Sequence, residues 1–288
     1  MNYLNKVSFF AFFLLVYPLL YCPGFSKPPP SLQRNHRNPK VLILIIASDN
    51  FPGVDLVFPY PTLKKIWGSY MHTHPNIEAY FIQGDPNLSS PYEIQGDVIW
   101  SKTEENLRPG ILNKTLLSIQ CMLPRINEFD YVLRTNLSSF YVFPRLLHFL
   151  QTLPQNGCYS GFKMLCGEHK LFFGHGCGFI MSTDVATYLV NNQDDLKRQI
   201  NINSMNDDVV IGHFFEKSGI HLTQAPLTYL LSLKDWKHYQ KHEASSDFHF
   251  RVKNKTHKLR ATHDVSILKS LLKKFYGLSV PEDLSLDK

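Results

Sequence analysis

Two adjacent acids, Asp207 and Asp208, stand at the predicted start of a helix and are followed by the apolar residues Val209, Val210 and Ile211. A carboxylate in the first turn of a helix complements the helix dipole and caps free N–H groups, but one acid is enough for that role. A carboxylate at the edge of a pocket can also accept the proton of an attacking hydroxyl, provided that it is ionised near neutral pH. The pair is therefore a candidate both for a helix cap and for acid–base catalysis.

A second candidate lies near the carboxyl terminus, where the segment 248–254 alternates apolar and basic residues and includes His249, Arg251 and Lys253. The alternation predicts a strand or a pocket loop. Arginine can hold a diphosphate through two parallel hydrogen bonds, so Arg251 and Lys253 are candidate diphosphate ligands. Alternatively, they belong to a solvated basic face, because this region supplies much of the net charge of +6. No motif of a nucleic-acid-binding module accompanies them, so we expect no nucleic-acid partner.

Strands and helices that could position these residues alternate from Lys40 onward. Apolar, β-rich runs predict strands at 41–46, 77–82, 97–100 and 131–133. Between the last two, apolar residues at helical spacing predict a helix at 111–126. Strands separated by helices predict an α/β fold with a mostly parallel sheet that is covered on both faces.

Two later segments continue this alternation. Residues 178–181 predict a strand that runs into a helix capped by Ser182 or Thr183, and another helix is predicted from Asn206 to about Gly219. In such a sheet the ligand binds at the carboxyl ends of the strands. We therefore expect the chemistry just after Leu133, just after Met181 and at the start of the helix at Asn206.

The amino terminus differs from the rest of the 288-residue chain. An almost unbroken apolar run follows Lys6 and ends near Cys22, and a Pro-rich segment comes next. The run is short for a membrane-spanning helix and long for a signal peptide, so its length does not separate the two. No small-x-small cleavage site follows, which favours a short anchor. We predict an anchor or signal at 1–22, a stem at 23–39 and one folded domain at 40–288.

A secretory route would place four cysteines in an oxidising compartment: Cys121, Cys158, Cys166 and Cys177. Two disulfides are then possible, in any of three pairings. A structural zinc site is disfavoured, since the close spacing of zinc-binding cysteines and histidines is missing. Asparagines of the N-glycosylation sequence pattern stand at Asn87, Asn113, Asn136 and Asn254, which is compatible with the same route.

Several segments in the same order resemble the β-1,3-glycosyltransferases, which include galactosyl- and N-acetylglucosaminyltransferases and their Fringe relatives. The segments are 63–68, 80–84, 93–99, 112–115, 129–134, 176–182 and 207–212. Gly176 and Gly178 with Ser182 are similar to that family's Gly-x-Gly-Tyr-x-x-Ser turn, and Asp207-Asp208-Val209 is similar to its Glu-Asp-Val. The resemblance covers roughly 40–220.

This resemblance implies a GT-A-type, Rossmann-like nucleotide-diphosphosugar transferase fold and an inverting reaction. An acceptor hydroxyl would attack the anomeric carbon of a nucleotide sugar, with a UDP-sugar favoured as the donor. Carried over by position, Asp208 would be the base, and Asp207 would orient the acceptor or raise the pKa of its neighbour. His249, ahead of His257 and His263, would be the late histidine that often completes a metal site in GT-A enzymes.

The chain departs from the family where a DxD metal motif is expected. Asn136 and Ser138 occupy the outer positions of that motif, after Arg134. Neutral amide and hydroxyl oxygens bind Mn²⁺ or Mg²⁺ far more weakly than carboxylates do. Three interpretations remain: a weak metal site completed by the diphosphate, metal-free catalysis in which Arg134 or a basic residue of the carboxyl-terminal cluster neutralises the leaving group, or an inactive descendant.

The sequence thus predicts a hexosyltransferase of the secretory pathway, a single-pass type II glycoprotein of the Golgi membrane, or else a secreted one. Its partners would be a nucleotide sugar, a glycan or glycoprotein acceptor and, through the amino-terminal segment, the membrane. The alternative is a non-catalytic protein of the same fold that binds a carbohydrate or another partner.

Overall fold

The computed structural model describes residues 38–48, 60–167 and 170–280, and these residues belong to one compact unit. The predicted anchor or signal and nearly all of the predicted stem lie outside the described residues. Within those three ranges, no helix is long and apolar enough to cross a bilayer.

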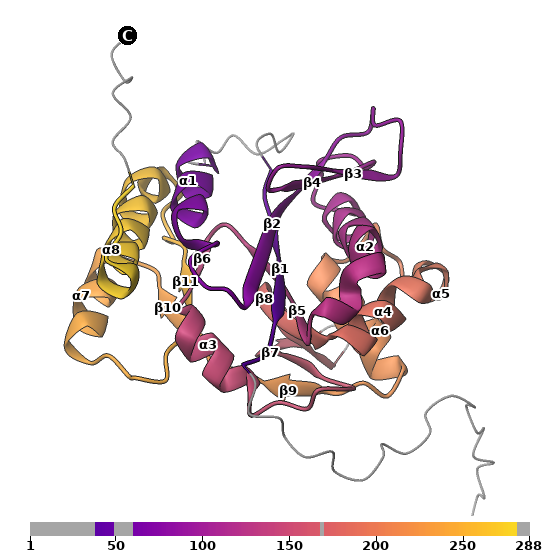
Figure 1. The fold of residues 1–288 in the computed structure, drawn as a ribbon. Coiled ribbons are helices and arrows are strands. Elements are labelled where there is room, and N and C mark those ends of the chain that lie inside the picture. The colour runs from indigo at the N-terminus through magenta and orange to yellow at the C-terminus, as the bar shows by residue number, and fades with distance from the viewer. Residues whose placement is uncertain (1–37, 49–59, 168–169, 281–288) are drawn as a thin grey trace, which may run out of the picture. The chain divides into compact units, whose positions relative to one another are not determined.

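A mixed eight-stranded sheet forms the centre of this unit (Figure 1). Its strands are β1 (Val41–Ile46), β2 (Ile77–Gly84), β3 (Tyr92–Gln95), β4 (Val98–Ser101), β5 (Tyr131–Asn136), β7 (Tyr159–Cys166), β8 (Leu171–Ser182) and β9 (Leu222–Gln224). Their order is β3-β4-β2-β1-β5-β8-β7-β9. Only β3 and β8 run against the others, because each pairs antiparallel with its neighbours. The predicted α/β class with a mostly parallel sheet is confirmed.

Both faces of the sheet are covered, since alternate residues of β1 enter two different cores. Val41 and Ile43 belong to one apolar cluster, and Leu42 and Leu44 to the other. The second core is completed by α2 (Gly110–Met122), α4 (Thr183–Asn191), α5 (Gln193–Gln199) and α6 (Asp207–Lys217). The first is completed by α1 (Tyr60–Tyr70), α3 (Phe143–Leu150), α7 (Leu233–Lys241) and α8 (Val265–Tyr276). A strand buried on both faces needs an uninterrupted apolar sequence, which is why β1 was readable from sequence.

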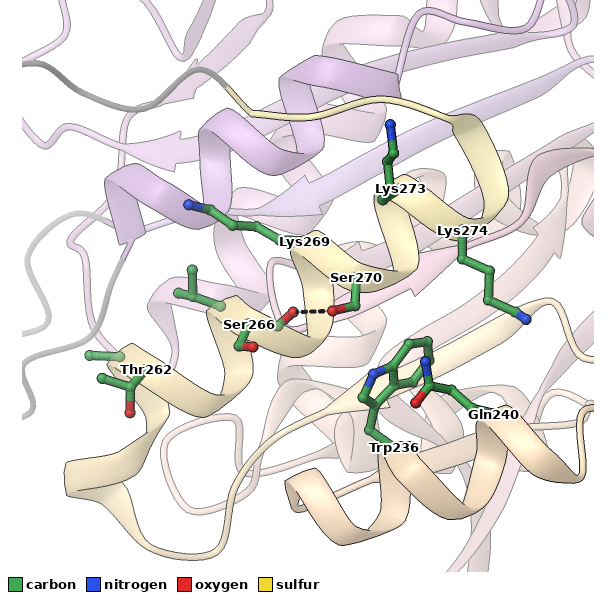
Figure 2. A pocket seen from close by; sticks show the side chains of 10 residues that line it. Trp236, Gln240, Thr262, Ser266, Lys269, Ser270, Lys273 and Lys274 are labelled. Atoms are coloured by element: carbon green, nitrogen blue, oxygen red, sulfur yellow. Dashed lines mark hydrogen bonds between the residues drawn. The ribbon is translucent and has the colours of Figure 1, made fainter.

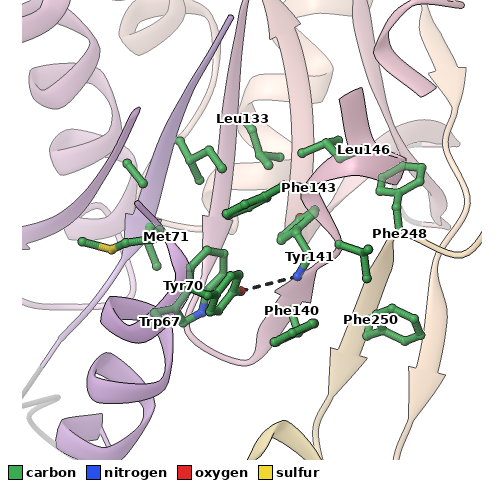
Figure 3. Close-up of a cluster of buried hydrophobic side chains, with 14 of the residues drawn as sticks. Trp67, Tyr70, Met71, Leu133, Phe140, Tyr141, Phe143, Leu146, Phe248 and Phe250 are labelled. Atoms are coloured by element: carbon green, nitrogen blue, oxygen red, sulfur yellow. Dashed lines mark hydrogen bonds between the residues drawn. The ribbon is translucent and has the colours of Figure 1, made fainter. Parts of the chain in front are cut away.

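A second, three-stranded sheet consists of β10 (Thr228–Leu230), β11 (His249–Val252) and β6 (Ser139–Tyr141), in that order. Phe140 and Phe250 pair across β6 and β11 and join an aromatic cluster with Tyr70 (Figure 3). The hydroxyl of Tyr276 in α8 accepts from the Phe143 amide at 2.9 Å and donates to the Tyr141 carbonyl at 2.9 Å. These contacts fix the small sheet beside the carboxyl end of β5.

Two local predictions need correction. The helix predicted at 111–126 ends at Met122, and a 3₁₀ turn over Leu123–Glu128 follows, because Pro124 cannot continue the α-helical hydrogen bonds. Ser182 is the N-cap residue of α4, yet its hydroxyl does not cap the helix. It accepts instead from the Cys158 amide at 2.9 Å.

The predicted disulfides are not present among the described residues, where Cys121, Cys158, Cys166 and Cys177 are all free thiols. Cys158 and Cys177 are buried as small apolar side chains, which is a common role of unpaired cysteine. Of the four glycosylation sequons, only Asn87 has an exposed side chain.

Candidate functional site

The candidate site lies where the two sheets meet, at the carboxyl end of β5. Because β8 runs antiparallel to β5, its residue Gly178 pairs with Thr135, and Gly176 lies just beyond. The segment after β5 then turns into β6, the third strand of the small sheet. Two of the places at which the sequence predicted chemistry meet here: the residues after Leu133 and the start of the helix at Asn206, whose acids contact Arg134 and Gly176. The third prediction, just after Met181, is wrong, because Ser182 pairs with Tyr131 at the amino end of β5.

Arg134 is the buried cation of this site, with a side chain that is 2% exposed. Its guanidinium forms an ion pair with Asp207 and donates a further hydrogen bond to the Gly176 carbonyl at 2.7 Å. Arg134 also lies over the ring of Phe179, 5.3 Å from its centroid. Its charge is therefore neutralised inside the protein, which argues against the predicted role as a diphosphate ligand.

Asp208 is held by backbone N–H groups instead of by a cation. Its Oδ2 accepts from the Gly176 amide at 2.7 Å, and its Oδ1 accepts from the Val209 amide at 3.0 Å. The N-cap residue of α6 is Asn206, and no side chain caps the helix there. Both acids thus face β8 and β5, and the geometry favours a site over a simple helix cap.

Burial controls the protonation of the two acids. It raises the pKa of Asp207 to about 6, with Arg134 opposing the shift and Asp208 adding to it. Burial also raises the pKa of Asp208, and Arg134 and the amides of Gly176 and Val209 oppose that shift. A carboxylate with a raised pKa is a stronger base while it remains ionised, as general base catalysis requires.

A glycine is needed at position 176. A Cβ built there would lie 2.7 Å from Oδ2 of Asp208 and 3.4 Å from Nη1 of Arg134. Since real Cβ atoms do not approach this closely, any side chain would displace Asp208. The Gly-x-Gly pattern of the sequence is explained by this contact and by Gly178, where a Cβ would overlap the Tyr141 hydroxyl.

Asn136, one of the two predicted DxD positions, joins the same network. Its Nδ2 donates to the Gly176 carbonyl at 2.9 Å, and its Oδ1 accepts from Nη1 of Arg251 at 2.6 Å. At the other position, Ser138 accepts from Arg260 at 3.4 Å. The oxygens expected to bind a divalent cation therefore bind guanidinium groups, and this donor set does not fit Mn²⁺ or Mg²⁺.

Arg251 and Lys253 are cations without an acidic partner: none of the ion pairs among the described residues involves either side chain. By contrast, Arg134 pairs with Asp207 and Arg260 pairs with Asp264. Arg251 is 8% exposed, whereas Lys253 is exposed. Most lysines of the same basic region are also exposed, which agrees with a solvated face for them.

Burial and the positive charges of this region lower the pKa of His175. Its pKa is lowered to about 4, first by burial and then by the charges of Arg251, Lys253 and Arg134. His175 is thus neutral near pH 7, and the cations around it favour an anionic ligand.

His249, the predicted metal ligand, is buried in the small sheet. Its ring stacks on Tyr141 at a centroid distance of 4.3 Å, and burial with the charge of Arg251 holds its pKa well below the usual range. Its Nε2 atom has no hydrogen-bond partner within the described ranges. In the part of the chain that the structure describes, no group of three or more His, Cys, Asp or Glu residues could hold a metal ion.

One part of the site was missed from sequence: a buried lysine beside the carboxyl ends of β1 and β2. Lys114 of α2 is fully buried and forms an ion pair with Glu105 at 2.7 Å and a hydrogen bond with Ser48 at 2.8 Å. Glu105 also accepts from the Gly84 amide at 2.5 Å. The family resemblance included Lys114 without giving it a role; a lysine inside an apolar helix face was the available signal.

Away from these residues, an open groove of about 810 Å³ runs between α7 and α8 (Figure 2). Trp236 and Gln240 line it from α7, and Ser266, Ser270 and Lys273 line it from α8. None of the predicted site residues contributes to this groove.

No protein-family model matches the sequence, and no curated protein matches it either. Among solved structures, the chain is similar to the crystal structure of a glycosyltransferase involved in the glycosylation of the major capsid of PBCV-1. The likeness has a TM-score of 0.44 and 11% sequence identity, and it covers 80% of this chain and 99% of that chain. A likeness of this size assigns neither a family nor an activity, so membership of the β-1,3-glycosyltransferases stays a hypothesis.

Proposed function

We propose that this protein is a glycosyltransferase that moves a hexose or an N-acetylhexosamine from a nucleotide sugar to a glycan acceptor. The proposal is carried by Arg251 and Lys253, two cations that have no acidic partner among the described residues. Arg251 is linked through Asn136 and Gly176 to Asp208, a carboxylate held by backbone amides, and the charges of both cations act on His175 nearby. Transfer from a nucleotide diphosphosugar needs both features in one place, a base for the acceptor and positive charge for the leaving group.

In the proposed reaction, the acceptor hydroxyl attacks the anomeric carbon of the donor, and Asp208 takes up the proton of that hydroxyl. The new carbon–oxygen bond forms as the bond between the anomeric carbon and the diphosphate breaks. The nucleoside diphosphate leaves with the electron pair, and Arg251 and Lys253 stabilise its added charge. Attack opposite the leaving group inverts the anomeric centre.

Asp207 has a positioning role in this proposal. Its ion pair with the buried Arg134, whose other donor binds the Gly176 carbonyl, fixes the strand that in turn holds Asp208. The charges of Arg134 and Asp207 also act on Lys114, so the buried network extends to the ends of β1 and β2. That edge is the side on which a nucleotide base would bind in a sheet of this type.

The same arrangement supports donor binding without a metal. The guanidinium of Arg251 already lies on the Asn136 oxygen, where the family resemblance would put a ligand of the cation. A fixed positive charge at this position replaces one function of the metal, neutralisation of the diphosphate.

The test is calorimetric titration of UDP into the full-length protein, once with excess EDTA and once with millimolar Mn²⁺. We expect binding in EDTA, and we expect Arg251→Gln combined with Lys253→Gln to weaken it more than the chelator does. Lys255→Gln combined with Lys258→Gln is the matched control, because both lysines are exposed on the same basic region. Binding that requires Mn²⁺ would contradict the metal-free proposal.

A donor-hydrolysis screen across common nucleotide sugars then identifies the sugar. If nucleotides bind but no donor sugar is hydrolysed or transferred, the result would support the alternative, a non-catalytic binding protein. The burial of both acids, 6% exposed for Asp207 and 9% for Asp208, is the observation that favours this alternative.

We also propose that the protein enters the secretory pathway and that its folded unit lies in the lumen. The apolar segment before residue 23 supports this second proposal. Protease protection of the folded unit in sealed microsomes would support it. Full digestion without detergent would contradict it.

A further inference from the structure

We propose that Tyr229 is the platform on which a sugar ring of the acceptor stacks; this inference rests on the glycosyl transfer proposed above. Tyr229 lies in β10, the strand of the small sheet that is furthest from β6. It pairs with Arg251 of β11, and Arg251 pairs with Ser139 of β6. Directly paired residues project from the same face of a sheet, so the three side chains form one row.

The exposure of this row rises from the interior to the surface. Ser139 is fully buried, Arg251 is 8% exposed and Tyr229 is 37% exposed. At the buried end of the row, Ser139 donates to the Cys177 carbonyl of β8 at 2.7 Å. Arg251, the proposed diphosphate ligand, lies in the middle, and Tyr229 reaches solvent. Tyr229 stands at the outer, exposed end of this row, and this is where we place the acceptor.

Two neighbouring rings fix the orientation of the Tyr229 ring, which remains 37% exposed. Phe162 of β7 meets it in a T-shaped contact at 5.6 Å, and His175 of β8 does so at 6.5 Å. A ring fixed in this way, with a hydroxyl at its tip, suits the apolar face of a pyranose and one of its hydroxyl groups. By contrast, Trp67 is 1% exposed within the aromatic core and is unavailable for stacking.

The position of Tyr229 favours the acceptor over the nucleotide base. Its ring neighbours lie on β7 and β8, which follow β5 in the sheet order, whereas β1, β2 and β4 lie on the other side of β5. A nucleotide binds at the carboxyl ends of the parallel strands on that other side. The diphosphate at Arg251 would then separate the base from Tyr229.

The experiment measures two affinities in parallel on the full-length protein: that of UDP by calorimetry and that of oligosaccharides by saturation-transfer NMR. The oligosaccharide panel ends in galactose, glucose, mannose or N-acetylglucosamine. Tyr229→Ala should weaken oligosaccharide binding about five- to tenfold, the scale of one lost aromatic contact, and leave UDP affinity within about twofold. Tyr229→Phe should keep most of the affinity. Tyr92→Ala, in the edge strand β3 of the eight-stranded sheet, is the matched control and should change neither.

Equal oligosaccharide affinity in Tyr229→Ala and the parent would overturn the inference, as would a panel in which nothing binds or an equal loss of UDP affinity. Failure of the proposed function is a different result: no UDP binding and no transfer, with oligosaccharide binding that still depends on Tyr229. That outcome would keep the platform and make the protein a carbohydrate-binding protein.

Discussion

Asp208 and Asp207 are neighbours in sequence, yet the structure gives them different environments. Asp207 faces a buried guanidinium, while Asp208 accepts two backbone hydrogen bonds, from Gly176 and Val209. The guanidinium of Arg134 occupies an oxygen of Asp207, whereas no cation pairs with Asp208 among the described residues. In the proposed reaction, Asp208 is therefore the base.

Asp208→Asn should lower the rate of transfer by at least about a hundredfold, because an amide cannot accept the proton of the acceptor. The loss should appear in kcat, with little change in UDP affinity. Asp194→Asn is the control, since Asp194 is an exposed acid in the first turn of another helix, α5. Parental kcat in Asp208→Asn would remove this residue from the mechanism.

The pH dependence of transfer should report the buried base. Burial raises the pKa of Asp208 above its ordinary value of 3.8, and the base must be ionised to act. Activity should therefore rise with pH through that raised pKa and level off above it. The raised pKa also means that protonation of Asp208 stabilises the fold at low pH and that this contribution is lost as pH rises through the folded-state pKa. A profile of kcat/KM from about pH 4 to pH 8, with folding checked by circular dichroism, measures this rise in activity. Activity that is constant over this range would contradict the assignment of Asp208 as the base.

At the scale of elements, the turn between β5 and β6 decides whether the site carries positive or negative charge. Asn136 and Ser138 supply neutral oxygens, and Arg251 and Arg260 bind them from the neighbouring segments. Carboxylates at these two positions would pair with the arginines and would also offer ligands to a divalent cation.

The double substitution Asn136→Asp with Ser138→Asp should consequently reverse the metal response. Without metal, UDP should bind more weakly than to the parent, because the new acids neutralise Arg251. With Mn²⁺ the affinity should recover, since carboxylates supply the charge that a hard cation needs. Calorimetry in EDTA and in Mn²⁺ measures both effects. Asn136→Ser with Ser138→Asn keeps the turn neutral and should leave the response to Mn²⁺ unchanged.

The close approach of β8 to α6 gives a second prediction at this scale. Gly176→Ala should lower the rate of transfer by about ten- to a hundredfold. The new Cβ would lie only 2.7 Å from Oδ2 of Asp208 and would displace it, and a misplaced base accepts the proton less effectively. Gly68→Ala in α1 is the control, since a Cβ there meets nothing within 4 Å. It should leave transfer intact and stabilise the helix by about 0.5–1 kcal/mol. Equal transfer by the two variants would show that the contact has no role.

At the scale of the whole molecule, charge is distributed unevenly. The net charge is +6, and many of the basic residues gather in the carboxyl-terminal segments that form α7, β11 and α8. Of these, β11 carries Arg251 to the site, while most of the lysines face solvent. The basic region therefore combines two buried arginines, Arg251 and Arg260, with an exposed surface that raises the potential around them.

UDP affinity should consequently fall steeply with ionic strength. Phosphates that are held by cationic side chains lose affinity as salt screens the charges, with a Debye length of about 10 Å at 0.1 M. Calorimetry in about 0.05, 0.15 and 0.5 M NaCl, all with EDTA, measures the slope. The combined Arg251→Gln and Lys253→Gln variant should have a smaller slope. Identical slopes would mean that other groups bind the phosphates.

Local sequence by itself determined the strands and helices that are buried on one or both faces. The apolar run of β1 and the helical spacing of α2 each require a particular covering, so pattern and element agree. The location of the carboxylate pair at the start of α6 was also readable, because an amino-terminal acid is a local signal. The edge strands β9 and β10 are three residues each, too short to produce a pattern.

Only the tertiary structure decided which charges meet. Asp207 and Arg134 are 73 positions apart, and Asn136 and Arg251 are 115 apart, so no local pattern could reveal either contact. The same holds for Tyr229, whose position beside Arg251 depends on the register of the small sheet. The free energy of a buried charge depends on its nearest partners in space. Those partners are set by how strands pair and helices pack, and the local sequence, which favours strand or helix, does not determine that packing.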